Sequence, residues 1–218
     1  MYVPAVPPAP PVLAQAPFTV DSAALGISAT AHRSRRTSIM ISRRTLDTLA
    51  GHAAVVRGRL LVRGAGLLGE DVLLQAWSGG RWSTLAGART GAAGRFLLRY
   101  LPRRIGSERV RVRFSGAAGL SAARRALGRL NVYRPVQVSW YGGGGGLACG
   151  GSLTGATMGV ASRTLPCGML VTLHFQGHSV RVPVVDRGPY VQGREFDLTE
   201  ATKQALRFGD TGELWSTS

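Results

Sequence analysis

The chain has 218 residues and a formal net charge of +16, from 27 lysine and arginine residues against 11 aspartate and glutamate residues. This length suits one large domain or two small ones, and no segment is long and apolar enough to span a membrane. All of the excess charge lies before Val136, where polyanions would be attracted at low salt. The alternative is an arginine-rich surface set by codon bias, because Lys203 is the only lysine. After Val136 the basic residues (Arg163, Arg181, Arg187, Arg194, Lys203, Arg207) equal the acidic ones in number (Asp186, Glu195, Asp197, Glu200, Asp210, Glu213).

Residues 1–45 are first proline-rich and then rich in serine and arginine, which predicts a disordered leader or linker. Residues 12–16 end in small side chains and resemble the cleavage site of an export signal. No positive charge precedes them, and prolines interrupt any apolar helix there. Export through this segment would therefore imply that the start of the sequence is truncated or misassigned.

Residues 46–133 contain short segments in which apolar and polar residues alternate, separated by glycine-rich turns. This spacing predicts a β-sandwich, and the region resembles small immunoglobulin-like domains, although it lacks the cysteine pair of an antibody domain. Three arginines at alternate positions are expected to make one face basic. Trp77 and Trp82 flank a turn, where partial packing is favoured over stacking on sugar rings. The expected strands cover residues 55–62, 72–77, 81–85, 96–100, 109–114 and 126–133.

Arg134 and Pro135 are expected to be a short join before a second β domain, residues 136–218. A helix fits residues 200–207, with Thr199 as its N-cap and Gly209 closing its end. Expected strands cover residues 136–141, 158–161, 170–175, 180–185 and 213–216.

Asp186 stands where the alternating strand before it meets a turn formed by Gly188 and Pro189. A carboxylate at a strand end can be held rigidly and still face a cleft, and partly apolar surroundings favour its protonated form. Asp186 is therefore a candidate proton donor. The competing interpretation is that its carboxylate only caps the turn.

Five motifs in the C-terminal third occur in the order typical of one family. They are Ser139-Trp140-Tyr141-Gly142, Ala148-Cys149-Gly150-Gly151, Arg163-Thr164-Leu165-Pro166-Cys167-Gly168, Asp186-Arg187-Gly188-Pro189-Tyr190 and Gly193-Arg194-Glu195-Phe196-Asp197-Leu198-Thr199. Together they resemble the rare lipoprotein A family, over residues 136–218. The resemblance implies a mainly β chain that ends in a six-stranded double-psi β-barrel with one short helix, related to expansins.

That family includes septal lytic transglycosylases, which cleave the glycan strands of peptidoglycan. Their acid is the aspartate of the motif that matches Asp186 here. The resemblance implies a secreted or cell-wall protein whose partner is the glycan strand, and anionic wall polymers then become candidate partners of the basic N-terminal region. Nucleic acid is not favoured, because no recognition helix or stacking sheet accompanies the charge.

The chain departs from the transglycosylase pattern at two positions. Gly151 stands where the family commonly has glutamate, and Ser162 stands where it commonly has histidine. Two hypotheses remain: a lytic transglycosylase that uses Asp186 first as acid and then as base, and a non-catalytic, expansin-like module that binds or loosens polysaccharide. The first requires burial to raise the pKa of Asp186 and the guanidinium of Arg187 to point away from it.

The remaining site residues are assigned by their places in these motifs. Asp197 is expected to be structural and to hold backbone amides. Cys149 and Cys167 lack the partners of a zinc site; a disulfide is expected if the chain is exported, and two free thiols are the alternative. No metal or cofactor is expected. The expected substrate-binding residues are Tyr141, Ser162, Arg163, Arg187 and Tyr190.

Overall fold

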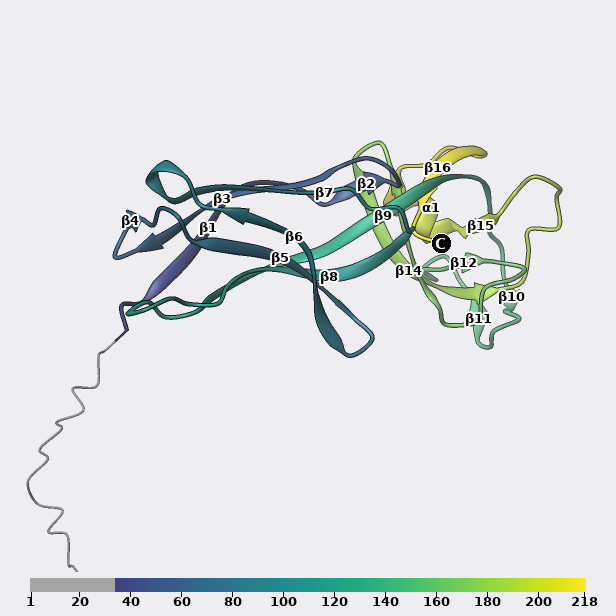
Figure 1. The fold of residues 1–218 in the computed structure, drawn as a ribbon. Helices are drawn as coiled ribbons and strands as arrows, with labels where there is room; N and C mark the ends of the chain where they lie inside the picture. Colours follow the sequence, from purple (N-terminus) through teal and green to yellow (C-terminus); the bar gives the residue numbers. More distant parts are fainter. Residues whose placement is uncertain (1–33) are drawn as a thin grey trace, which may run out of the picture. The chain divides into compact units, whose positions relative to one another are not determined.

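The computed structural model describes residues 34–218 (Figure 1). The segment that resembles an export signal, and the expected leader as far as residue 33, lie outside the described residues. The expectation of disorder up to residue 45 is wrong for Thr37–Thr45, which forms strand β1. Buried Thr37 and Ile39 alternate with exposed neighbours in β1, and the strand pairs with β3 (Ala54–Val62). Its serine- and arginine-rich composition concealed this alternation.

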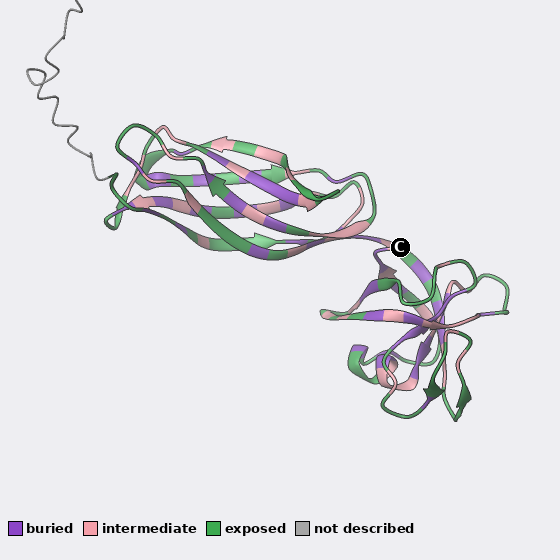
Figure 2. Cartoon of the chain, turned by 90° about the horizontal axis from the view of Figure 1, so that it is seen from below, coloured by how far each residue is buried: buried purple, intermediate pink, exposed green. Residues whose placement is uncertain are grey.

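Two sheets enclose one apolar core in the N-terminal region. The first sheet holds β1, β3, β4 (Ala65–Gly66) and β7 (Arg95–Tyr100), and a 3-10 turn at Ala92–Gly94 precedes β7. The second holds β2 (Asp47–Leu49), β5 (Asp71–Ser78), β6 (Arg81–Arg89), β8 (Gly106–Phe114) and the first part of β9 (Ala123–Tyr141). Buried and exposed residues alternate along these strands (Figure 2), and the buried ones form the core. Each expected strand is present with shifted ends, and the immunoglobulin-like classification stays a prediction.

Strand β9 overturns the expected join between two domains. Arg134 and Pro135 lie inside this strand, which pairs with β8 and β2 before them and with β16 and β15 after them. Pro135 pairs with β16 on one side of the strand, while the pairing with β15 on the other side begins only at Val138. Proline is tolerated here because one side of its backbone has no partner strand. A proline beside an arginine suggested a linker, and the register of the sheet shows a strand.

The second region is a closed barrel of six strands. These are the end of β9, β12 (Val160–Ala161), β13 (Leu170–Phe175), β14 (His178–Asp186), β15 (Phe196–Thr199) and β16 (Gly212–Ser216). The order is β15-β12-β14-β13-β16-β9, and the pairing of β15 with β9 closes the ring. A separate apolar core fills it. Strand β15 was not among the expected strands, and a hairpin of β10 (Gly145–Gly146) with β11 (Ser152–Leu153) lies outside the ring.

Helix α1 (Glu200–Leu206) forms where the sequence predicts a helix. Thr199 occupies the N-cap position, but its hydroxyl donates to the Gly159 carbonyl at 3.1 Å instead of capping the helix. The helix ends at Arg207 in the left-handed conformation, and not at Gly209. Among residues 34–218 no helix is long and apolar enough to cross a membrane.

Candidate active site

Asp186 and Asp197 flank the same residue of the barrel wall. Strand β12 runs between β14 and β15, and its Ala161 pairs with Asp186 on one side and with Asp197 on the other. Neighbouring strands lie about 4.8 Å apart, so the backbones of the two acids are separated by about two strand spacings. The barrel therefore places both carboxyl-bearing residues at one level of its wall.

The turn after β14 passes close to this level. Gly188 has φ +135°, and a Cβ built on it would lie 3.7 Å from both Ala161 Cβ and Asp197 Oδ2. The peptide bond from Gly188 to Pro189 is cis. Glycine is required here by backbone conformation, because residues with a side chain rarely adopt this φ.

The carboxylate of Asp186 is fixed by one of its two oxygens. Oδ1 accepts hydrogen bonds from the backbone N–H of Ala148 at 2.9 Å and of Arg187 at 2.8 Å. Oδ2 accepts none among the described residues. The turn-capping interpretation is thus correct for Oδ1, and it leaves Oδ2 available to a ligand.

Tyr141 and Ser139 reach the same site from alternate positions of β9. The Tyr141 hydroxyl is buried and has no hydrogen-bond partner in residues 34–218. Burial raises the pKa of Tyr141 above its usual value, and the charge of Asp186, the proximity of its carboxylate as a hydrogen-bond acceptor, and the charge of Asp197 raise it further. The Asp186 carboxylate therefore lies close to this hydroxyl, although the two form no hydrogen bond of normal geometry. The hydroxyl therefore stays protonated and lies within the field of both carboxylates.

Asp197 has a different partner from the one expected. Its Oδ1 accepts a hydrogen bond from the hydroxyl of Ser139, which is buried on β9, and not from a backbone amide. Asp197 and Ser139 are also paired across β15 and β9. The contact joins the two strands that close the barrel, which fits the structural role assigned to Asp197.

The predicted disulfide is confirmed. Cys149 and Cys167 are bonded, with their Cα atoms 5.5 Å apart. Cys149 N–H donates to the Val185 carbonyl at 3.2 Å, and the N–H of Gly168 donates to the Val184 carbonyl at 2.8 Å. The disulfide therefore joins two loops that both bind the end of β14, beside Asp186.

Arg187 braces the second of these loops. Its guanidinium donates to the carbonyls of Ser162 and Leu165 at 3.1 and 3.0 Å, and to Sγ of Cys167 at 3.0 Å. It forms no ion pair with Asp186 in the described part of the chain, as the sequence interpretation requires. With its donors engaged by the loop, a contact between Arg187 and substrate stays a prediction.

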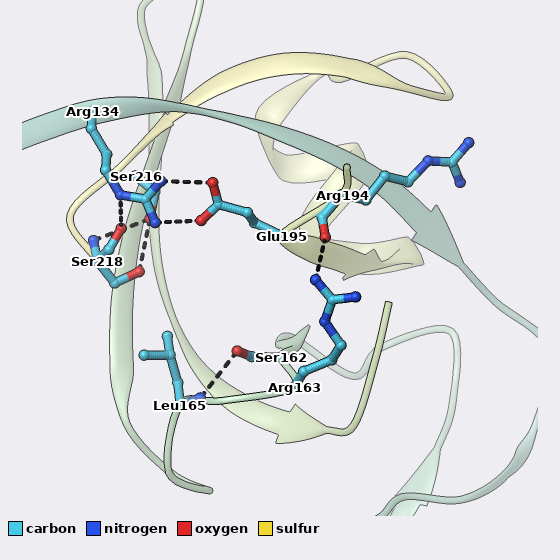
Figure 3. Close-up of polar contacts among 8 residues, drawn as sticks. All are labelled: Arg134, Ser162, Arg163, Leu165, Arg194, Glu195, Ser216 and Ser218. Carbon is cyan, nitrogen blue, oxygen red and sulfur yellow. Dashed lines mark hydrogen bonds and ion pairs between the residues drawn. The ribbon is translucent and has the colours of Figure 1, made fainter. Parts of the chain in front are cut away.

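Ser162 and Arg163 line a small hollow of about 170 Å³ on the barrel (Figure 3). Ser162 is only 2% exposed, and its hydroxyl accepts a hydrogen bond from the N–H of Leu165 at 3.2 Å. A contact between Ser162 and substrate stays a prediction. The Arg163 guanidinium reaches the Arg194 carbonyl at 3.4 Å (Figure 3). An ion pair between Arg134 and Glu195 forms another wall of the hollow.

The remaining expected positions lie at the surface. Tyr190 is 82% exposed, and Gly151 is exposed in a left-handed conformation with nothing near the position of a Cβ. Sequence reasoning missed the Ala148 amide, which no side-chain pattern reveals, and Ser139, whose alternation with Tyr141 on one strand was a usable signal. Within residues 34–218 no three His, Cys, Asp or Glu side chains are grouped to hold a metal ion.

Comparison with known proteins bears on the barrel. Residues 135–214 match the family model described as lytic transglycolase. Over 73 residues the chain is 42% identical to the probable endolytic peptidoglycan transglycosylase RlpA of Aquifex aeolicus (strain VF5). That alignment covers 31% of this chain and 32% of the relative, so it spans about a third of that protein. These findings support the resemblance of the barrel to the rare lipoprotein A family.

One solved structure is also similar in part. The Streptomyces papain inhibitor matches with a TM-score of 0.33 and 22% sequence identity, over 38% of this chain and 90% of that one.

Proposed function

We propose that this chain acts on peptidoglycan and that its barrel is a lytic transglycosylase with Asp186 as acid and base. The match of residues 135–214 supports the class of reaction. The observation that carries the assignment of Asp186 is the asymmetry of its carboxylate: two amides hold Oδ1, while Oδ2 has no partner in the described residues. A fixed carboxyl group with one available oxygen suits proton transfer to a bound substrate.

The reaction would proceed in two proton transfers. Protonated Oδ2 donates its proton to the glycosidic oxygen, and the bond from that oxygen to the anomeric carbon breaks with the electron pair on the leaving sugar. A hydroxyl of the remaining sugar then attacks the anomeric carbon, and Oδ2 takes up the proton that this hydroxyl loses. An anhydro sugar end results, Asp186 is protonated again, and no water is consumed. One carboxyl group can serve in both steps, whereas most glycosidases use two.

The Tyr141 hydroxyl is the second group that we assign to the site. It is buried without a partner, and an unsatisfied buried hydroxyl costs about 1–3 kcal/mol of stability. The neighbouring carboxylate of Asp186 already acts on this hydroxyl, and a sugar oxygen would reach it only if the surrounding residues shift. We assign Tyr141 to substrate binding on that condition, and Asp197 to holding Ser139 and the closing strands in place.

A non-catalytic, expansin-like binding module is the second candidate. The observation in its favour is that Gly151 and the buried Ser162 supply no side chain that could replace the family's glutamate and histidine. In that case the surface around Asp186 would bind glycan without cleaving it.

Mass spectrometry of purified glycan strands after incubation with the full chain separates the two candidates. New anhydro-sugar ends, absent with Asp186→Asn and present with the exposed control Glu213→Gln, would support the transglycosylase. Glycan binding without new ends in the wild type would favour the binding module, and neither binding nor cleavage would overturn both.

A further inference from the structure

The outer face of the second N-terminal sheet carries an ordered array of arginines. Arg109, Arg111 and Arg113 occupy alternate positions of β8. The neighbouring strand β9 adds two more: Arg124 pairs with Arg113, and Arg129 pairs with Arg109. We call these five residues the arginine ladder. Alternate residues of a strand lie about 6.6 Å apart and adjacent strands about 4.8 Å apart, so the ladder repeats positive charge at intervals of a few ångströms.

Tryptophans and polar groups hold the ladder in place. The Arg111 guanidinium lies over the Trp82 ring, 3.9 Å from its centroid, and donates to Gln75 Oε1 at 3.0 Å. Arg109 lies over the ring of Trp77, 5.7 Å from its centroid. Ordering these side chains in advance lowers the entropy that a ligand would lose on binding them.

The ladder is not neutralised by its neighbours. The two ion pairs of the described residues, Arg134 with Glu195 and Lys203 with Asp210, lie elsewhere. Burial lowers the pKa of Arg111, and the charges of Arg113 and Arg124 lower it further. Such mutual repulsion is relieved when an anion binds between the guanidinium groups.

Acidic residues are scarce on these strands. Asp71 stands at the start of β5, opposite Arg89. Glu108 alternates with the ladder and so falls on the other side of β8, and its charge acts on Arg129 at the end of the ladder away from the hollow. Neither carboxylate is placed between the arginines, which leaves the centre of the face positive.

A hollow of about 480 Å³ lies at one end of the ladder. Arg111, Arg113 and Arg124 line it, and Phe114, Ala122 and Ala123 give it an apolar part. Guanidinium groups bind phosphate oxygens in pairs, with a geometry that suits phosphate better than a neutral sugar hydroxyl. The hollow therefore fits one phosphate group together with a short aliphatic spacer.

We propose that the arginine ladder binds a linear polyol-phosphate polymer, of the kind attached to cell walls, with one phosphate in the hollow of Arg111, Arg113 and Arg124. The choice of a wall polymer rests on the proposed function, whereas the phosphate chemistry rests on the ladder alone. Single-stranded nucleic acid is the less suitable polyanion, because its bases need exposed aromatic rings for stacking. The two indoles of this face pack against each other, with centroids 5.4 Å apart, and are covered by arginines.

Titration of the full chain with a labelled glycerol-phosphate oligomer tests the proposal, because binding is measured independently of glycan cleavage. The comparison probes are a neutral glycan fragment and a single-stranded DNA oligomer with the same number of phosphates. The test variant is Arg111→Gln/Arg113→Gln/Arg124→Gln. A second variant, Arg113→Gln/Arg124→Gln, keeps the contact between Arg111 and Trp82, so that a loss of binding cannot be attributed to the loss of that contact. The matched control, Arg57→Gln/Arg95→Gln/Arg99→Gln, removes the same charge from exposed positions of the other sheet.

We expect both ladder variants to weaken binding of the glycerol-phosphate oligomer by about 10-fold or more at 0.15 M salt, and the control variant to weaken it by less than about 3-fold. Equal losses in ladder and control variants would overturn the proposal, since diffuse charge would then explain binding. Tighter binding of DNA than of glycerol phosphate by the wild type would also overturn it, as would the absence of phosphate-polymer binding.

Discussion

Removal of the disulfide should lower the free energy of unfolding of the barrel, by an amount that depends on the length of the loop that the bond closes. Cys149 and Cys167 are 18 residues apart in the sequence. Closing a loop of this length restricts the unfolded chain by roughly 3 kcal/mol at 25 °C in the chain-entropy model. The double variant Cys149→Ser/Cys167→Ser should lose this amount from the free energy of unfolding of the barrel. It should also weaken the hold of the Ala148 amide on Asp186, because Cys149 follows Ala148 directly.

Amide hydrogen exchange followed by mass spectrometry measures this loss region by region. In the double variant, the slowest amides of β13 and β14 should exchange roughly 100-fold faster, which corresponds to about 3 kcal/mol. Peptides from β5 and β8, in the other core, serve as the internal control and should change little. Unchanged exchange in β14, or an equal acceleration in β5 and β8, would refute the reasoning that the bond stabilises the barrel around Asp186.

Three further outcomes are expected from single substitutions. Asp186→Asn should lower glycan cleavage by about 100-fold or more while glycan pull-down persists, and unchanged cleavage would remove Asp186 from the mechanism. Because the folded-state pKa of Tyr141 is raised, its contribution to stability is present below pH ~10, the pKa of an unfolded tyrosine, and is lost as pH rises above it. Between pH 9 and 11, the free energy of unfolding should therefore fall less for Tyr141→Phe than for wild type when it is measured by chemical denaturation. If the free energies of the two proteins fall in parallel with pH, the burial of Tyr141 does not contribute in this way. Gly188→Ala should cost about 1–3 kcal/mol by backbone strain and reduce cleavage, so a variant of full stability would show that this turn is not constrained.

Much of the barrel could be predicted because its signals are local. The strand that ends at Asp186, the hairpin before it and helix α1 all follow from alternation and turn residues. The order of the motifs indicated the family resemblance, and the absence of zinc-site partners around Cys149 and Cys167 indicated the disulfide. Strand β15 escaped notice because it is short and runs directly into the helix.

Other features depend on contacts that sequence patterns do not encode. The extent of β9 was hidden by Pro135, whose tolerance depends on which side of the strand is paired. The placement of Asp186 and Asp197 on either side of Ala161 follows from the order of strands in the sheet. The burial of Ser162 likewise depends on packing.

Strand β9 changes sheet at the peptide bond between Tyr133 and Arg134: residues 131–133 pair with β2, and residues 134–138 pair with β16. When two binding modules are joined by a linker, its length and stiffness set how readily both are occupied at once. Here no residue stands between the two sheets to act as a linker. The arginine ladder and the site at Asp186 are therefore joined through one continuous strand, and Arg181 of β14 also donates to the hydroxyl of Ser107 on β8 at 3.1 Å. A spacer inserted after Tyr133 would introduce the linker that the chain lacks.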